Sequence, residues 1–189
     1  MFKSVNYLVI ALSLCIFINL ATSGVEAQTL LAAKAKQQAA SPATTSSQAK
    51  ATLSEGLPQI LKNAKPSQGG ICTVDLINDS LDAVVTVKKD SPFSIGGWAI
   101  DDKTQSAPKD ILIQLVSQKN KKNYYAVGVR VERPDVADHF KIPAYKNSGF
   151  ELRTASVSHL PTGTYLIRVI QVTGKNVIVC ESPKKLNIM

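Results

Sequence analysis

Residues 165–180 of this chain read YLIRVIQV, then TGKN, then VIVC. Two apolar, β-rich runs flank a short connection that contains a glycine, which is the usual composition of a hairpin turn. In the first run apolar side chains fall on both faces of an extended strand. We therefore expect a β-hairpin whose first strand is buried on both faces over part of its length.

Further β-rich runs precede this hairpin at near-regular spacing, and each ends at a turn signal. The runs span residues 71–77, 83–87, 93–100, 111–116, 124–131 and 150–155, and residues 186–188 form a final edge. No amphipathic helix of about 12 residues interrupts them. The pattern over residues 71–189 predicts an all-β domain, an immunoglobulin-like antiparallel β-sandwich of seven or eight strands.

The run 93–100 contains the only tryptophan of the chain. By strict alternation Phe93 and Ile95 share one face, and Trp98 and Ile100 share the other. A one-residue bulge at the glycine pair 96–97 would bring all four side chains to one face. We therefore expect Trp98 in the core. The alternative is an exposed tryptophan that stacks on a ligand.

The first 27 residues have the pattern of a secretory signal peptide and are not expected to belong to the fold. Lys3 lies in a short basic region, residues 7–21 are almost continuously apolar, and Val25 and Ala27 form a small-residue cleavage pattern. We expect cleavage after Ala27 and a periplasmic or secreted product. The alternative is an uncleaved segment that anchors the protein in the inner membrane, although a spanning helix needs about 20 apolar residues.

Residues 28–70 are predicted to form a low-complexity basic tether. Up to residue 52 they contain mainly Ala, Gln, Lys, Ser and Thr, which bury too little apolar area to offset chain entropy. Leu57, Ile60 and Leu61 have helical spacing and indicate two turns that dock on another surface. The lysines of this tail favour weak contact with anionic surfaces. Nucleic acid is not an expected partner, because no stacking aromatics are interleaved with the lysines.

Removal of the signal segment would leave two of the three cysteines, Cys72 and Cys180. An even pair of thiols in an exported chain predicts one disulfide, with two separate buried thiols as the alternative. Since the first and last strands of such sandwiches run close, we expect the first and eighth runs to lie side by side.

The composition excludes several classes of protein. A hydrophobic content of 44% excludes wholesale disorder, and three Cys with two His are too few for a zinc-finger array. The chain has no phosphate-binding glycine loop, H-E-x-x-H or G-x-S-x-G motif. We expect no cofactor and no metal. Asp101, Asp102 and Asp135 offer oxygens of the kind that bind Ca²⁺, but they lack the loop spacing of a calcium site.

Candidate catalytic groups are equally few. Ser156, Ser158 and His159 are neighbours in the sequence, but successive residues of a strand point to opposite faces. A small hydrolase is therefore the least favoured function, and we predict that the chain is not an enzyme.

Four motifs follow one another in a fixed order: GWAID at 97–101, RPDVA at 133–137, SGF at 148–150 and LPTGTY at 160–165. They resemble the immunoglobulin-like β-sandwich modules of bacterial envelope proteins, which carry G-W-A-[IV]-D, then R-x-D-V-A, then S-G-F. The resemblance covers roughly residues 93–172. It implies a module appended to membrane-bound or secreted proteins, and it carries over no catalytic residue.

The matching positions also have a physical interpretation. The candidate core and structural residues are Trp98, Asp101, Arg133, Asp135, Gly149 and Phe150. We expect Asp135 to cap a single helical turn, and Arg133 to pair with a carboxylate such as Asp101. Gly163 is expected to supply a positive φ in a turn that enters a strand.

These observations predict a non-catalytic exported module that acts by protein–protein contact with an envelope protein whose identity the sequence does not give. The alternative is a glycan-binding surface built from Tyr124, Tyr125 and Tyr145. Two consecutive tyrosines on a strand send one ring outward, and grouped exposed rings would favour this alternative.

Overall fold

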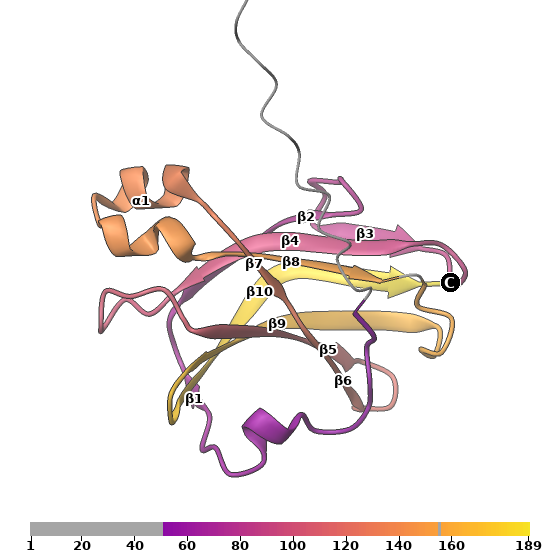
Figure 1. Ribbon diagram of the computed structural model, residues 1–189. Helices are drawn as coiled ribbons and strands as arrows, with labels where there is room; N and C mark the ends of the chain where they lie inside the picture. The colour runs from indigo at the N-terminus through magenta and orange to yellow at the C-terminus, as the bar shows by residue number, and fades with distance from the viewer. Residues whose placement is uncertain (1–50, 155) are drawn as a thin grey trace, which may run out of the picture. The chain divides into compact units, whose positions relative to one another are not determined.

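The computed structural model describes residues 51–154 and 156–189 (Figure 1). The predicted signal peptide and the tether up to residue 50 lie outside these residues. In these residues ten strands form two sheets that pack face to face, which confirms the all-β immunoglobulin-like sandwich but exceeds the seven or eight strands predicted. Two predicted strands, 71–77 and 93–100, have the observed bounds.

The larger sheet has six strands and the smaller has four. The six-stranded sheet contains β1 (Ser67–Gln68), β10 (Asn176–Ile188), β9 (Gly163–Thr173), β5 (Asp110–Ser117) and β6 (Asn123–Val127) in that order, with β3 (Val84–Val87) also on β10. The four-stranded sheet contains β2 (Ile71–Ile77), β4 (Phe93–Ile100), β8 (Gly149–Thr154) and β7 (Val129–Val131). The helical elements are η1 (Gln59–Leu61), α1 (Pro134–Phe140) and η2 (Pro143–Asn147).

Strand β10 makes the sandwich more complex than the sequence indicated. It joins two runs that were predicted separately, and it pairs antiparallel with β9 but parallel with both β1 and β3. The prediction of a wholly antiparallel sandwich is therefore wrong at these two pairings. β1 pairs at Ile178 and Val179, and β3 pairs from Lys185 onward. The two short strands thus occupy successive parts of an edge that would otherwise be open to other chains.

Side chains from both sheets fill the core between them. Among the largest fully buried side chains are Tyr165, Phe93, Phe150, Ile95, Ile113 and Leu115. The hydroxyl of Tyr165 donates a hydrogen bond to the carbonyl of Pro161 at 2.6 Å, in the arrangement called a tyrosine corner. Burial raises the pKa of Tyr165 to about 12. Gly163, in the same turn, has the expected positive φ of 142°.

The expectation that Trp98 lies in the inner core is wrong. Strand β4 alternates without interruption, so Phe93 and Ile95 face inward while Trp98 lies half-buried on the outer face. The register shift occurs instead on the partner strand β2, between Val74 and Leu76. Because the extra residue is in β2, the glycine pair of β4 does not change the phase of that strand.

Residues 51–70, which we call the strap, pack against the sandwich, so the predicted tether and the domain start at residue 71 are wrong for this segment. Leu53 is buried in the inner core, and Leu61 is buried against the outer face of the six-stranded sheet. Ser54 exchanges two backbone hydrogen bonds with Tyr125, at 2.8 and 2.9 Å. The physical reason is that this outer face is apolar and needs a cover. Its buried side chains are Leu112, Tyr125, Ile170, Val172, Val177 and Val179.

Cys72 and Cys180 form the predicted disulfide, with their Cα atoms 6.1 Å apart. Cys72 belongs to β2 in the four-stranded sheet and Cys180 to β10 in the six-stranded sheet. The two strands lie close together, as expected, but they belong to different sheets and do not pair side by side. The bond crosses the sandwich and joins its two layers.

Candidate interaction site

The chain makes a long excursion, residues 132–148, between the paired strands β7 and β8. Hairpin connections usually have two to five residues, and longer ordered connections often carry function. The excursion contains α1 and η2, drawn in orange in Figure 1. Pro134 occupies the start of α1, where its missing N–H costs no helical hydrogen bond. Lys141 ends the helix in the left-handed conformation, with φ of 58°.

A cluster of rings attaches the excursion to the outer face of the four-stranded sheet. Trp98 and Phe140 meet edge to face with their centroids 5.7 Å apart, and Phe140 and Tyr145 do so at 5.5 Å. Ile100 and Val136 complete the buried part of this cluster. Burial raises the pKa of the Tyr145 hydroxyl. The half-buried Trp98 is therefore the sheet's contribution to the attachment of the excursion.

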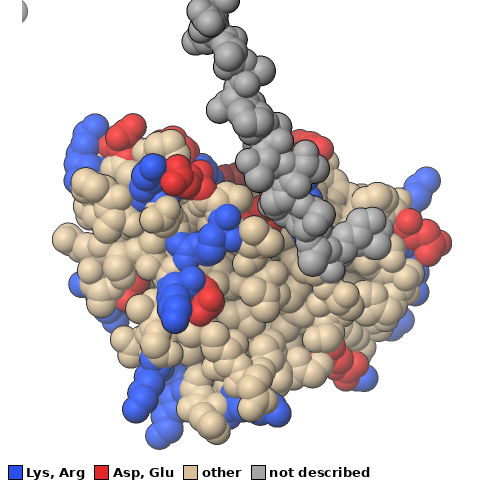
Figure 2. All heavy atoms as spheres, in the orientation of Figure 1, with Lys and Arg blue, Asp and Glu red and all other residues tan. Residues whose placement is uncertain are grey.

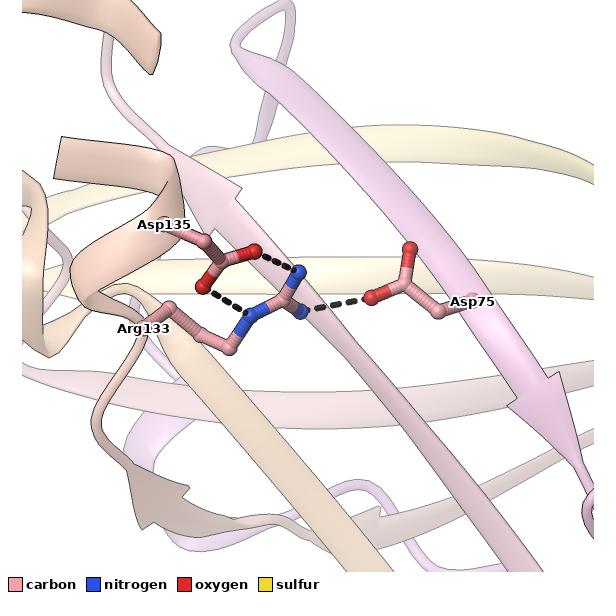
Figure 3. Close-up of polar contacts among 3 residues, drawn as sticks. All are labelled: Asp75, Arg133 and Asp135. Carbon is pink, nitrogen blue, oxygen red and sulfur yellow. Dashed lines mark hydrogen bonds and ion pairs between the residues drawn. The ribbon is translucent and has the colours of Figure 1, made fainter. Parts of the chain in front are cut away.

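Arg133 fixes the excursion by charge (Figure 3). Its Nε and Nη2 donate to the two carboxylate oxygens of Asp135 at 2.9 and 2.7 Å, and its Nη1 donates to Asp75 at 2.5 Å. The hydrogen bonds that Arg133 donates to Asp135 raise the pKa of Arg133 and lower the pKa of Asp135. Asp75 lies on β2, at the opposite edge of the sheet from β7. Arg133 thus links the excursion to a distant strand.

Two of the predicted roles in this cluster are corrected by the geometry. Asp135 lies in the first turn of α1, but Arg133 is the N-cap residue and no side-chain capping hydrogen bond is present there. Asp101 is not the partner of Arg133. Its Oδ1 accepts the backbone N–H groups of Lys103 and Thr104 at 3.0 and 3.3 Å, which closes a local turn.

Gly149 and Phe150 have separate structural roles. A Cβ atom on Gly149 would lie 2.6 Å from Cγ of Arg133 and 2.6 Å from the carbonyl oxygen of Val131, so the arginine stem requires glycine at this position. Phe150 points the other way, into the inner core. A Cβ on Gly97 would lie 2.9 Å from its ring. The SGF and GW motifs thus pack the two faces of one sheet.

A groove of about 370 Å³ lies along the excursion. Pro134, Ala137 and Pro143 contribute its apolar part, and Asp138, Lys141 and Lys146 its charged part. Lys146 pairs with Glu132 at 3.1 Å, whereas Lys141 has no ion pair among the residues that the structure describes. Two prolines make the floor rigid, so the groove is suited to receive an apolar side chain beside a carboxylate.

The three tyrosines proposed to bind glycans are buried, so the expectation that they form an exposed surface is wrong. The side chains of Tyr124, Tyr125 and Tyr145 are 4%, 8% and 2% exposed. The rings of Tyr124 and Tyr165 pack in the core with their centroids 6.1 Å apart. Tyr125 does send its ring to the outer face, but the strap covers that face, and its hydroxyl accepts a hydrogen bond from Gln114 at 3.1 Å.

The residues considered for catalysis and for metal binding have other partners. His159 donates a hydrogen bond through Nε2 to the carbonyl of Leu53 at 2.6 Å, while the hydroxyls of Ser156 and Ser158 lie 3.1 Å from each other. Over residues 51–154 and 156–189, no three His, Cys, Asp or Glu side chains gather where they could hold a metal ion.

Sequence reasoning missed Asp75 and the groove. Asp75 is the single charged residue of the run ICTVDLI, and a lone carboxylate in an apolar strand is a signal that a cationic partner lies nearby. The groove gives no comparable signal, because it forms only where α1 and η2 meet.

The fold and this site define an immunoglobulin-like β-sandwich that carries a fixed excursion on one sheet. No family model matches the sequence, and no curated protein matches it significantly. None of the helices in the described part of the chain has the length and apolar character needed to cross a bilayer.

Proposed function

We propose that the chain is a non-catalytic exported module that acts by protein–protein contact in the cell envelope, through the groove of the 132–148 excursion. The observation that carries the proposal is that α1 is fixed on one side by the Arg133 ion pairs and by edge-to-face ring contacts, while its groove stays open. A surface held rigid before binding loses little conformational entropy when a partner docks.

The chemistry of the groove specifies the kind of partner. Pro134, Ala137 and Pro143 offer apolar contact, and Lys141 offers an ammonium group for a carboxylate. The matching partner is a protein segment that presents an apolar side chain next to an acidic residue. Such anchors in pockets commonly supply most of the energy of a small interface.

The compartment and the other partners are part of the same proposal. The apolar run and small-residue pattern of residues 1–27 favour export, and a disulfide that joins the two sheets is typical of an oxidising compartment. Lys34, Lys36 and Lys50 in the tail favour weak contact with anionic surfaces. On the part of the face drawn in Figure 2 that is described, basic and acidic side chains are interspersed over uncharged surface. This distribution differs from the basic stripe of nucleic-acid-binding proteins.

Site-specific photo-crosslinking in the native envelope tests the proposal. A benzophenone amino acid at position 138, at the groove, is expected to capture a partner that the same group at Thr86, on exposed β3, does not capture. Lys141→Glu should reduce that capture about tenfold, because it replaces an attractive charge with a repulsive one. Lys119→Glu, in an exposed loop away from the groove, is the matched control and should leave it unchanged. Equal capture from both positions, or capture insensitive to Lys141→Glu, would contradict the proposal.

A further inference from the structure

A second hollow, of about 240 Å³, lies at the end of the sandwich where the β9–β10 hairpin turns. Three segments that are distant in sequence line it: the strap through Lys65, the loop after β4 through Lys103 and Thr104, and the hairpin through Lys175 and Asn176. Lysines from three different parts of the chain therefore line one concave site.

The lysines have no evident structural role. None of Lys65, Lys103 and Lys175 forms an ion pair with another residue in the described ranges. The one carboxylate of the hollow is Asp101, which is 6% exposed and is held by the two backbone N–H groups described above. The lining thus carries a net charge of +2, from three lysines and one aspartate. A concave site of one sign concentrates counter-ions.

We propose that this hollow binds a phosphate group. Phosphate carries more than one negative charge near neutral pH and offers oxygens that accept from ammonium, hydroxyl and amide donors, which Lys65, Lys103, Lys175, Thr104 and Asn176 supply together. The volume corresponds to about eight waters at about 30 Å³ each, so the site also has room for a small group attached to the phosphate. This site does not depend on the groove of the excursion or on the function proposed for it.

Titration of the full chain with inorganic phosphate, followed by backbone amide NMR, tests the proposal. Shifts are expected at Lys103, Thr104 and Asn176. The triple variant Lys65→Gln, Lys103→Gln, Lys175→Gln should weaken binding at least about tenfold, since three attractive charges are lost. The control triple Lys88→Gln, Lys119→Gln, Lys121→Gln makes the same charge change at the opposite ends of β9 and β10 and should change the affinity less than about twofold.

The variant Asp101→Asn tests whether the hollow binds a negatively charged ligand. The amide oxygen keeps an acceptor for the turn while the negative charge disappears, so phosphate should bind about threefold tighter, as expected for one charge a few ångströms away in a water-like dielectric. Weaker phosphate binding in Asp101→Asn would overturn the proposal, because the loss of a negative charge beside a bound anion should strengthen binding. Absence of localised shifts, or equal losses in both lysine triples, would also overturn it.

Flotation with vesicles separates two sources of phosphate. Vesicles that contain phosphatidylglycerol are compared with vesicles of phosphatidylcholine alone. Binding to the former that the Lys65, Lys103 and Lys175 triple abolishes assigns the site to a lipid headgroup. Binding of inorganic phosphate without vesicle binding assigns it to a soluble phosphate compound. Both outcomes support a phosphate site.

Discussion

The two sheets of the sandwich have their outer faces covered by different kinds of segment. The strap reaches the six-stranded sheet from before the first long strand and is held by the apolar side chain of Leu61 and by short backbone pairings. The excursion covers the four-stranded sheet from between β7 and β8 and is held by ion pairs and by edge-to-face ring contacts. The strap is a largely apolar cover that precedes the long strands in the sequence. The excursion is a polar and aromatic cover that lies between two strands of the sheet it covers.

The difference between the two segments shows how a segment that covers a sheet can also form a binding groove. The strap buries Leu53 in the inner core and Leu61 on the outer face of the six-stranded sheet, and it leaves Leu57 and Ile60 exposed as single side chains. The excursion is fixed by Arg133 beside its helix and by rings beneath it, so the remaining side of α1 is free to form a groove. Attachment at separate points keeps a surface both rigid and unoccupied.

The largest expected effect comes from the disulfide, which joins the strands that anchor both covers. Strand β2 carries Asp75 for the excursion, and β10 pairs with β1 of the strap. Cys72→Ala with Cys180→Ala opens a separation of 108 residues and should lower the free energy of unfolding by about 4–5 kcal/mol. Urea denaturation of oxidised wild type and variant measures the loss. Reductant should lower wild type to the level of the variant and leave the variant unchanged, and equal stability before reduction would contradict the prediction.

The strap is tested by removing its buried contact on the outer face, Leu61. Leu61→Ala should lower the free energy of unfolding by about 2–3 kcal/mol, because it empties a site between the strap and the outer face of the six-stranded sheet. Leu57→Ala removes the same atoms from a side chain that is 48% exposed, and its effect should stay below about 0.5 kcal/mol. Similar losses in the two variants would mean that the strap does not protect this face.

The excursion is tested by removing its charged attachment. Arg133→Met keeps the stem over Gly149 but leaves two carboxylates without their partner, and it should cost about 1–2 kcal/mol. Hydrogen exchange should accelerate in α1 and stay unchanged in the strap. Arg153→Met, which removes an exposed pair with Glu151, is the control and should cost less than about 0.5 kcal/mol. Uniform acceleration of exchange would contradict independent attachment of the two covers.

The smallest effect is the pH dependence of the same attachment. Hydrogen bonds from Arg133 lower the pKa of Asp135 below its ordinary 3.8. The stabilisation is therefore complete above pH 3.8 and is lost as the pH falls through the lowered pKa of the folded state. The loss should be at most about 0.5 kcal/mol, since the carboxylate is mostly exposed. Urea denaturation between pH 2 and 6 should show that the free energy of unfolding falls less steeply toward low pH in Asp135→Asn than in wild type. The same pH dependence in both proteins would exclude this contribution.

Local patterns in the sequence were sufficient for several of the strands and for the turns beside them, but not for the short strand β1 or for the full length of β10. Period-two alternation and turn residues placed β2 and β4 at their observed bounds, and two-sided apolar composition predicted that β9 is buried on both faces. The glycine turn after β9 and the positive φ of Gly163 followed from the same kind of signal. Each of these features depends on neighbouring residues, so it can be recognised in a short window.

The candidate site depended on longer-range contacts. An arginine in a charged motif predicts a carboxylate partner, but the sequence offered Asp101 while the fold brought Asp75, which lies 58 positions away. One ring of the Tyr124–Tyr125 pair was expected to point outward, and the structure shows that it is Tyr125. Nothing nearby in the sequence indicated that the strap covers this ring.

The sequence by itself determined that this chain forms a disulfide-linked β-sandwich and that some of its strands must be covered on both faces. Only the tertiary structure decided which segments cover them, which carboxylates meet Arg133, and which tyrosines are buried. The physical reason is that alternation along a strand fixes the character of each face. The order of strands across the sheets then fixes which distant residues lie opposite that face.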